Sequence, residues 1–337
     1  MCVDIETLDG NHSLERTDSM RIEEELAGVR TVGITGHVRP DGDCLGSTLG
    51  LYNYLMENMP ELEVDLYLEE PGKEFSYLTN IGKIRHTVQE HKQYDVFFVL
   101  DCSSVDRIEP FAELFTGAVK TICLDHHISN LDFADVNLVK PDASSTCEVL
   151  YSTLDEAKIS KAVAECIYTG IIHDTGVFKY SCTSAYTMEI AGKMMEKGID
   201  YSDIIDNSFY KKTYVQNQIL GRALLESVLF YDGKCIFSSV TQEEMDFYGV
   251  SGKELGGIIE QLRLTEGVEV AIFLYQTGVR EYKVSLRSKK MIDVSRIATH
   301  FGGGGHVRAA GFTGKGTVYD IINSVGAMIE EQYDAAR

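Results

Sequence analysis

The chain has 337 residues, of which 44% are hydrophobic and 25% are charged, and its formal net charge is −21. These fractions are typical of a soluble globular protein, and the length favours about two domains. The acidic balance argues against a broad basic surface for long duplex nucleic acid, and no apolar run reaches the roughly 18 residues that would predict a transmembrane helix. We therefore expect a cytoplasmic protein without membrane contact.

The first part of the chain is predicted to be a leader followed by alternating strands and helices. Residues 1–20 are acidic and lack the basic-then-apolar pattern of a secretory signal, so we expect a disordered leader. From residue 21 to 185, apolar runs of strand length alternate with helical patterns, which indicates βαβ units and a parallel sheet. The predicted strands are Thr31–Gly36, Val64–Leu68, Tyr94–Leu100 and Val119–Leu124. The predicted helices are Leu45–Asn58, Ser145–Glu156 and Lys161–Ile172.

The second part of the chain is predicted to be a helical connector over residues 186–227 and a smaller α+β domain over 228–337. In that domain Asp232 and Gly233 separate two apolar runs, which predicts a hairpin with a type I′ turn. Further strands are expected over Val268–Tyr275 and Glu281–Arg287. Helices are expected over Tyr186–Lys197, Tyr214–Glu226, Leu255–Leu264, Met291–Phe301 and Val318–Gln332.

Four separate segments of the first domain deliver Asp or His side chains, three of them at the ends of predicted strands. They are His37-x-x-x-Asp41-x-Asp43, Asp101, Asp125-His126-His127 and Asp174. In a parallel sheet the carboxyl ends of the strands form one edge, where sites are built. A lone Asp after a strand is more often a helix N-cap or turn residue. Four such segments together instead favour a hydrolytic site with two metal ions.

A run of four glycines, Gly302 to Gly305, follows a predicted helix of the second domain. A helix C-cap needs one glycine, so the run indicates backbone that approaches a ligand closely. Exposed N–H groups in such a loop can bind an anion, and His306 and Arg308 can add donors to a phosphate. The alternative is a flexible loop. A dinucleotide-binding fingerprint is excluded because no strand directly precedes the glycines.

These residues resemble a known family. The four Asp and His segments resemble, in chain order, the motifs of the DHH phosphoesterase superfamily, and the glycine run resembles the signature of its DHHA1 substrate-binding domain. A compact chain of this kind is most similar to the NrnA type, which comprises bifunctional oligoribonucleases and 3′-phosphoadenosine 5′-phosphate (pAp) phosphatases. The resemblance implies an α/β fold with an N-terminal parallel-sheet DHH domain, a helical connector and a smaller α+β DHHA1 domain. It also implies hydrolysis of short RNA to mononucleotides and of pAp to AMP.

The resemblance assigns a role to each motif residue. One metal ion would be held by His37, Asp41 and Asp101, and the second by Asp43, Asp101, His126 and Asp174. His127 would face the substrate phosphate or the leaving group, with Asp125 orienting its neighbours. In the DHHA1 domain the substrate would be bound by Arg287, Gly303, Gly304, Gly305, His306 and Arg308.

The ligand set and the charge also suggest which metal and partners to expect. A mixed set of carboxylates and imidazoles favours Mn²⁺, with Mg²⁺ or Co²⁺ as alternatives. The partners expected are short single-stranded RNA or nucleotides, and a homodimer is left open. Alternative functions are a phosphodiesterase for pApA or cyclic di-AMP, a RecJ-like single-strand exonuclease, a family II inorganic pyrophosphatase (to which Ser288-Lys289-Lys290 bears a faint likeness), and a nucleotide-binding protein with an inactive site.

Overall fold

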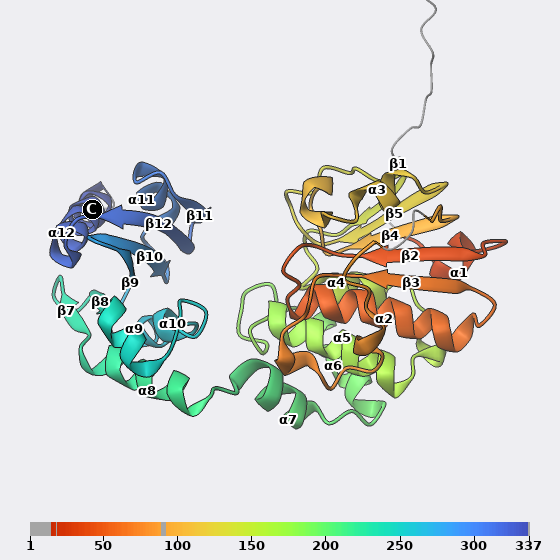
Figure 1. Ribbon diagram of the computed structural model, residues 1–337, viewed down its shortest axis with the longest axis horizontal. Coiled ribbons are helices and arrows are strands. Elements are labelled where there is room, and N and C mark those ends of the chain that lie inside the picture. The colour runs from red at the N-terminus through yellow and green to blue at the C-terminus, as the bar shows by residue number, and fades with distance from the viewer. Residues whose placement is uncertain (1–14, 18, 89–91, 336–337) are drawn as a thin grey trace, which may run out of the picture. The chain divides into compact units, whose positions relative to one another are not determined.

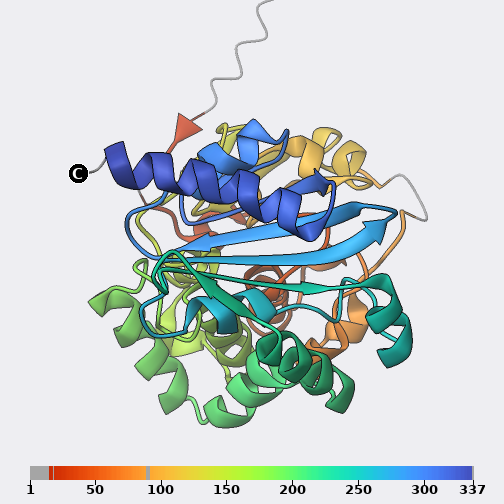
Figure 2. The ribbon, with the colours of Figure 1, turned by 90° about the vertical axis from the view of Figure 1, so that its left-hand side faces the viewer.

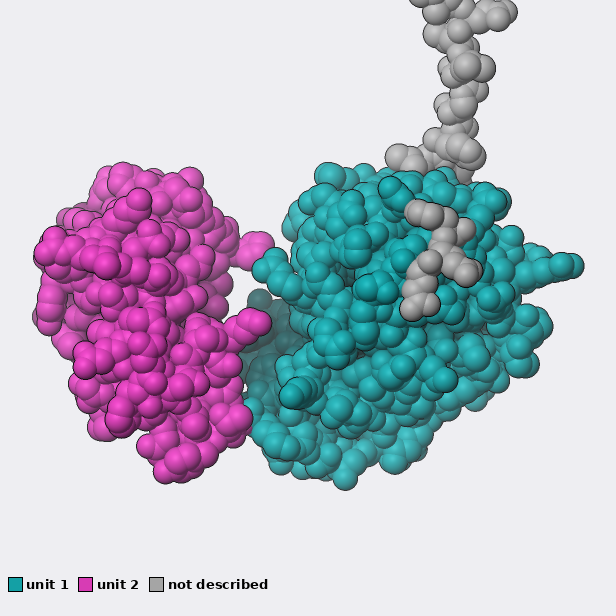
Figure 3. Space-filling model, in the orientation of Figure 1, with its two compact units in different colours: residues 1–211 teal, residues 212–337 magenta. Residues whose placement is uncertain are grey.

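The computed structural model of the protein describes residues 15–17, 19–88 and 92–335. The chain divides into two compact units between Lys211 and Lys212 (Figure 3). This division falls inside the connector expected over residues 186–227. The leader expected over residues 1–20 lies mostly outside the described residues, but its end forms a short strand, β1 (Glu15–Arg16).

Within the described residues, the first unit is built on a six-stranded sheet in which all neighbouring strands are parallel (Figure 1). The strand order is β1-β6-β5-β4-β2-β3. Its other strands are β2 (Thr31–Thr35), β3 (Glu63–Tyr67), β4 (Val96–Leu100), β5 (Lys120–Asp125) and β6 (Val136–Val139). The predicted parallel sheet and its four strands are therefore confirmed. β6 was missed because an apolar stretch of four residues that Asn137 interrupts is too short to stand out.

Helices cover both faces of this sheet, as continuous burial of β4 requires. One face packs on α2 (Gly42–Asn58) and α4 (Thr146–Tyr151), and the other on α3 (Ala112–Thr116). α5 (Lys161–Asp174) packs against α2 and α4, and α6 (Ala185–Glu196) packs against α5 and α4. The short helices α1 (Ile22–Glu25) and α7 (Tyr201–Ile204) complete the unit. Glycines let α2 and α5 approach closely, since a Cβ on Gly46 would lie 2.5 Å from the Cys166 carbonyl oxygen. This contact sets the start of α2 beside the end of α5.

In its described residues, the second unit contains a mixed six-stranded sheet of order β11-β12-β10-β9-β8-β7, parallel only between β8 and β9. Its strands are β7 (Val228–Phe230), β8 (Cys235–Val240), β9 (Val270–Gly278), β10 (Glu281–Ser288), β11 (Gly304–His306) and β12 (Ala309–Lys315). One face packs on α11 (Val294–His300) and α12 (Val318–Ala335), and α12 runs along the sheet (Figure 2). The other packs on α8 (Tyr214–Leu225), α9 (Gln242–Tyr248) and α10 (Ile258–Arg263).

The predicted hairpin between β7 and β8 is confirmed. Both central residues of its turn have positive φ, 52° at Asp232 and 78° at Gly233, as a type I′ turn requires. The Lys234 amide donates to the Tyr231 carbonyl at 3.0 Å and closes the turn.

The glycine run is not the open loop that the sequence suggested. The Gly302 amide donates to the Thr299 carbonyl at 3.0 Å and the Gly303 amide to the Ala298 carbonyl at 2.8 Å, a Schellman motif that ends α11. β11 then pairs with β12. The first two glycine amides are therefore used by the fold. Sequence reasoning missed this hairpin because the two glycines of β11, Gly304 and Gly305, carry no strand signal.

Among the described residues, no helix is both long and apolar enough to cross a membrane. The longest, α12, has 18 residues and buries only one side, including Ile321, Ile322, Val325 and Ile329. Its remaining faces carry acidic and polar residues, as expected of a helix on the surface of a globular unit.

Candidate active site

The strands of the first unit deliver the predicted metal ligands to one edge of the sheet. His37 follows β2, Asp101 follows β4, and His126 follows β5. Asp43 lies in the first turn of α2, and Asp174 is the last residue of α5. Parallel strands end on the same side, which brings together His37, Asp101 and His126. The packing of α2 against α5 adds Asp43 and Asp174, which lie 131 positions apart in the chain.

Asp41 serves as the N-cap of α2, which is the ordinary role of an Asp after a strand. Its Oδ1 accepts the amides of Asp43 at 3.1 Å and Cys44 at 3.2 Å. The same oxygen lies 3.7 Å from His37 Nε2. The Asp41 side chain thus caps α2 and also lies beside His37 among the predicted metal ligands.

Asp101 lies at the middle of the group. Its side chain is almost fully buried, with Oδ2 3.4 Å from His37 Nε2 and Oδ1 3.7 Å from His126 Nε2. Its φ of 56° is left-handed, a conformation that Asp adopts more readily than most residues. The two oxygens therefore face different histidines, which is the arrangement that a carboxylate shared by two cations requires.

Further ligand atoms flank this central carboxylate on both sides. His37 Nε2 lies near Asp41 on one side. On the other, His126 Nε2 lies 3.1 Å from Asp174 Oδ2 and 3.9 Å from Asp43 Oδ2. The potential ligand atoms of Asp43, His126 and Asp174 all lie within 4.8 Å of one another. The donor set, carboxylates with one imidazole on each side, fits two divalent cations.

Both histidines are oriented by their second ring nitrogen. His37 Nδ1 lies 2.9 Å from the Val38 carbonyl oxygen, and His126 Nδ1 lies 3.4 Å from that of Ala143. A metal-binding His commonly donates one ring N–H to such a carbonyl and turns the other nitrogen to the ion. The Nε2 atoms of both residues point at the carboxylates, so this observation supports the fit to cations.

The ionisable groups at this edge strongly perturb one another. Burial lowers the pKa of His37, but the hydrogen bond to Asp101 and its charge outweigh burial and raise the pKa to about 10. Burial likewise lowers the pKa of His126, and the hydrogen bond to Asp174 and nearby carboxylate charges raise it to about 10. Burial and the charge of Asp101 raise the pKa of Asp43 well above its usual range. In the metal-free protein, protons therefore offset part of the clustered negative charge.

Binding of Mn²⁺ to the metal-free protein is expected to release protons. Both histidines hold a proton below about pH 10, and a cation must displace it, so the affinity should rise with pH by about tenfold per unit for each proton released. Calorimetric titrations in two buffers with different ionisation enthalpies, between about pH 6 and pH 8, would count the protons. Equal heats in both buffers with a pH-independent affinity would contradict this expectation.

His127 is held by a buried carboxylate. Its Nδ1 lies 2.7 Å from Asp125 Oδ1, and this bond, with the carboxylate charge, raises the pKa of His127 above its usual range. Asp125 also accepts the His126 amide at 2.8 Å and Asn130 Nδ2 at 2.7 Å. Within the described part of the chain, His127 Nε2 has no hydrogen-bond partner, and the side chain is about one-third exposed. Asn130 was missed from sequence because a lone Asn in a loop gives no signal.

The start of α4 also contacts the predicted ligands. The amides of Thr146 and Cys147 donate to the two carboxylate oxygens of Asp43, at 2.6 and 3.0 Å. The Thr146 hydroxyl donates to Asp101 Oδ1 at 3.1 Å. Sequence reasoning placed a helix here but gave these residues no role, since a polar residue at a helix start is read as a cap.

A buried thiol borders the same group. Cys44 Sγ lies within 4.8 Å of the ligand atoms of His37 and Asp101, and burial raises the pKa of this thiol well above its usual range. The thiol points to the His37 carbonyl oxygen at 3.8 Å. A protonated thiol is a weak ligand beside imidazoles and carboxylates, so Cys44 is better described as packing beneath the group.

The predicted substrate-binding residues lie in the second unit, on β10, β11 and the turns beside them. Arg287 Nε is 2.7 Å from Glu260 Oε1, and Arg308 Nη1 donates to the Ile292 carbonyl at 2.8 Å. Arg287 Nη1 also donates to the Leu286 carbonyl at 3.1 Å, and Arg308 Nη1 also lies 3.5 Å from Ser288 Oγ. Each guanidinium thus has two partners in the fold and further donors besides. His306 is exposed.

The three glycines at this hairpin differ in what surrounds them. A Cβ on Gly303 would lie 2.2 Å from the Gly311 carbonyl oxygen, and one on Gly305 would lie 2.5 Å from that of Ala309. These two glycines are required by the fold itself. A Cβ on Gly304 would meet nothing within 4 Å, so its face is open.

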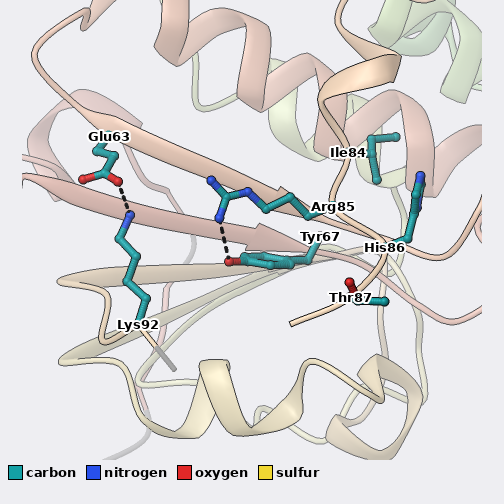
Figure 4. A pocket seen from close by; sticks show the side chains of 7 residues that line it. All are labelled: Glu63, Tyr67, Ile84, Arg85, His86, Thr87 and Lys92. Atoms are coloured by element: carbon teal, nitrogen blue, oxygen red, sulfur yellow. Dashed lines mark hydrogen bonds and ion pairs between the residues drawn. The ribbon is translucent and has the colours of Figure 1, made fainter. Parts of the chain in front are cut away.

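A hollow of about 640 Å³ lies beside β3, outside the group of predicted metal ligands (Figure 4). Its basic side chains are already paired. Arg85 Nη2 lies 2.5 Å from Asp65 Oδ1, while Lys92 Nζ lies 2.9 Å from Asp65 Oδ2 and 2.6 Å from Glu63 Oε1. These pairs hold Arg85 and Lys92 against the edge strand, and we assign no ligand to this hollow.

Two family models match the chain. The one described as DHH family, N-terminal domain, matches residues 31–171, and the one described as DHHA1 domain matches residues 232–332. The first range contains every predicted metal ligand except Asp174, which lies just beyond it. The second contains all of the predicted substrate-binding residues.

Curated relatives match most of the chain. A protein of Thermus thermophilus named bifunctional oligoribonuclease and PAP phosphatase NrnA is 28% identical over 93% of this chain and 94% of its own length. A Bacillus subtilis protein of the same name is 24% identical over 83% of this chain and 88% of its own length.

Solved structures share the fold. An exopolyphosphatase-related protein from Bacteroides fragilis is 26% identical, with a TM-score of 0.82 over 92% of this chain and 94% of its own. RecJ from Thermus thermophilus, solved in complex with Mn²⁺, is 15% identical, with a TM-score of 0.50 over 94% of this chain and 53% of its own. The chain thus spans about half the length of that RecJ.

Proposed function

Because the chain belongs to the DHH family and carries a DHHA1 domain after its DHH domain, we propose that it is a metal-dependent phosphoesterase that hydrolyses short RNA oligonucleotides to mononucleotides and pAp to AMP. The relatives named for these two activities match it over most of its length and theirs. The observation that carries the proposal is Asp101, whose two carboxylate oxygens face two different histidines. That arrangement suits phosphoryl chemistry with two cations.

The residues at the sheet edge would hold two divalent cations, with Mn²⁺ favoured and Mg²⁺ or Co²⁺ as alternatives. His37, Asp41 and Asp101 would bind one, and Asp43, Asp101, His126 and Asp174 would bind the other. When bound, such a pair lowers the pKa of water and neutralises charge on the phosphate. The protein contributes the fixed positions of these ligands, since strand and helix ends hold them.

His127 is proposed to deliver a proton to the leaving ribose oxygen from its free Nε2. The hydrogen bond to Asp125 raises the pKa of His127 above its usual range, which favours the protonated imidazole that a general acid requires. Asp125 holds the ring through Nδ1, and Asn130 in turn fixes Asp125. The proton is thereby kept at one defined atom.

The second unit is proposed to bind the rest of the substrate. The open face of Gly304 and the exposed His306 would approach a phosphate or nucleotide, with Gly303 and Gly305 shaping the hairpin. Arg287 and Arg308 would use the guanidinium donors that the fold leaves over.

Short substrates are expected to be hydrolysed fastest. The chain is strongly acidic, and long strands would meet repulsion without a basic surface to bind them. We expect the rate per enzyme with Mn²⁺ to fall by at least about tenfold between dinucleotides and RNA of about ten nucleotides, a difference of about 1.4 kcal/mol. Rates would be measured side by side for pAp, pApA and RNAs of two to ten nucleotides.

The same assay, extended to a long single strand and to pyrophosphate, separates the alternatives. A rate for pApA far above those for pAp and for other dinucleotides would replace the proposal by a pApA phosphodiesterase. Equal rates on short and long single strands would instead indicate a RecJ-like exonuclease. Hydrolysis of pyrophosphate alone would place the chain with the pyrophosphatases.

A further inference from the structure

Thr146 contacts two carboxylates of the proposed metal centre through different atoms. Its hydroxyl donates to Asp101 Oδ1 at 3.1 Å, and its backbone amide donates to Asp43 Oδ2 at 2.6 Å. The residue is fully buried at the first position of α4. It lies 45 residues from Asp101 in the chain and outside the four Asp and His segments and the glycine run.

The hydroxyl acts on the oxygen of Asp101 that faces His126. Asp101 Oδ1 lies 3.7 Å from His126 Nε2, whereas Oδ2 faces His37. A carboxylate oxygen has two lone pairs, so a donor on one of them leaves the other for a cation. The bond from Thr146 also limits rotation of the carboxylate, which must present one oxygen to each side.

The start of α4 is itself held firmly. Ser145 caps the helix by accepting the Glu148 amide at 3.1 Å. The buried Glu148 carboxylate accepts the hydroxyl groups of Ser144 and of Thr187 on α6, each at 2.7 Å. Hydrogen bonds within the start of α4 and from Thr187 on α6 hold the first turn of α4 in place. The Thr146 hydroxyl therefore has a defined position from which it donates to Asp101.

We propose that Thr146 is a positioning residue, whose hydroxyl sets the orientation of the Asp101 carboxylate so that it can be shared by two divalent cations. This inference rests on the proposed function, because it presumes the pair of cations. It does not make Thr146 a ligand or a participant in proton transfer. Partners of this kind, hydrogen-bonded to a ligand, typically change metal affinity by about 10- to 100-fold when removed.

The test is a titration of the full-length, metal-free protein with Mn²⁺ in the absence of substrate. Electron paramagnetic resonance monitors the binding at each step. Thr146→Val and Thr146→Ala both remove the hydroxyl with different side-chain volumes, and Thr146→Ser retains it. All three variants retain the backbone amide that contacts Asp43. The control is Thr153→Val, which removes a buried hydroxyl that, among the residues described, bonds only to the Leu150 carbonyl.

Thr146→Val and Thr146→Ala are expected to bind Mn²⁺ at least about tenfold more weakly and to lose the spin-coupled signal of a Mn²⁺ pair. The affinities of Thr146→Ser and Thr153→Val for Mn²⁺ should remain within about threefold of the wild-type affinity, a difference under 1 kcal/mol. If the hydroxyl-free variants bind two coupled Mn²⁺ ions as wild type does, or if Thr146→Ser loses as much affinity as Thr146→Val, the inference is wrong while the proposed function stands. A wild-type protein that binds fewer than two Mn²⁺ ions would overturn both.

Discussion

Asp101→Asn is expected to lower kcat for pAp and for dinucleotides by on the order of 10³-fold or more. Removing a single group that stabilises charge in a transition state already costs about 10²–10³-fold, and Asp101 is proposed to serve both cations at once. The amide has the same shape, and Asn tolerates the left-handed backbone, with φ 56°, that Asp101 adopts. The measurements are kcat with saturating Mn²⁺, the number of bound Mn²⁺ ions and the far-ultraviolet circular dichroism spectrum.

The matched control is Asp232→Asn in the hairpin turn of the second unit. Asp232 has nearly the same backbone conformation, with φ 52°, and lies outside the proposed metal centre. The Asp232→Asn variant should retain normal activity and bind two Mn²⁺ ions. If Asp101→Asn also keeps near-normal turnover and two bound ions, Asp101 is not a shared ligand and the two-cation proposal fails.

The position of the candidate site could be predicted because parallel sheets obey a simple rule. Once Thr31–Thr35, Val96–Leu100 and Lys120–Asp125 are read as parallel strands, their ends must lie on one edge. The polar residues that follow them are then neighbours whatever the length of chain between. The same strands were easy to find, since strands covered on both faces are continuous apolar runs.

The contacts that orient the ligands could not be predicted in this way. Thr146 and Asn130 act through single hydrogen bonds whose partners depend on how α4 and the loop after β5 pack. In the sequence a Thr in the first turn of a helix belongs to an ordinary helix start, and an Asn in a loop is a turn residue. Only tertiary structure shows that their donors reach Asp101 and Asp125.

For Thr146 and Asn130 the sequence indicated no role. For the glycine run, sequence reasoning instead gave one explanation to residues that have several. Its residues serve three physical needs: the helix end at Gly302, close strand approach at Gly303 and Gly305, and an open face at Gly304. Sequence reasoning assigned Gly303, Gly304 and Gly305 together to a ligand, because the run exceeds the one glycine that a cap requires. The structure leaves Gly304 as the position whose lack of a side chain the fold does not explain.

His127→Ala is expected to lower kcat/KM for dinucleotides by about 10²–10⁴-fold, the usual contribution of a general acid. A ribose alkoxide is a poor leaving group and needs a proton as the P–O bond breaks, and His127 Nε2 is proposed to supply it. The loss should be much smaller for a nucleoside p-nitrophenyl phosphodiester, within about tenfold or 1.4 kcal/mol, because p-nitrophenolate leaves without a proton. The measurement is kcat/KM for both substrates with saturating Mn²⁺.

The control for this prediction is His86→Ala, which removes another part-exposed histidine paired with a carboxylate, since His86 Nε2 lies 3.1 Å from Glu70 Oε2. His86 Nδ1 lies 2.9 Å from the carbonyl oxygen of Leu68, just after the end of the edge strand β3. His86 is none of the predicted site residues, and its loss should leave both rates unchanged. Asn130→Leu should lower kcat/KM for the dinucleotide less than His127→Ala does, because it frees Asp125 without removing the imidazole.

If His127→Ala lowers kcat/KM equally for the dinucleotide and the p-nitrophenyl substrate, the ring stabilises charge on the phosphate instead of protonating the leaving group. The assignment of the proton to His127 Nε2 would then be wrong, although the residue would still belong to the reacting centre.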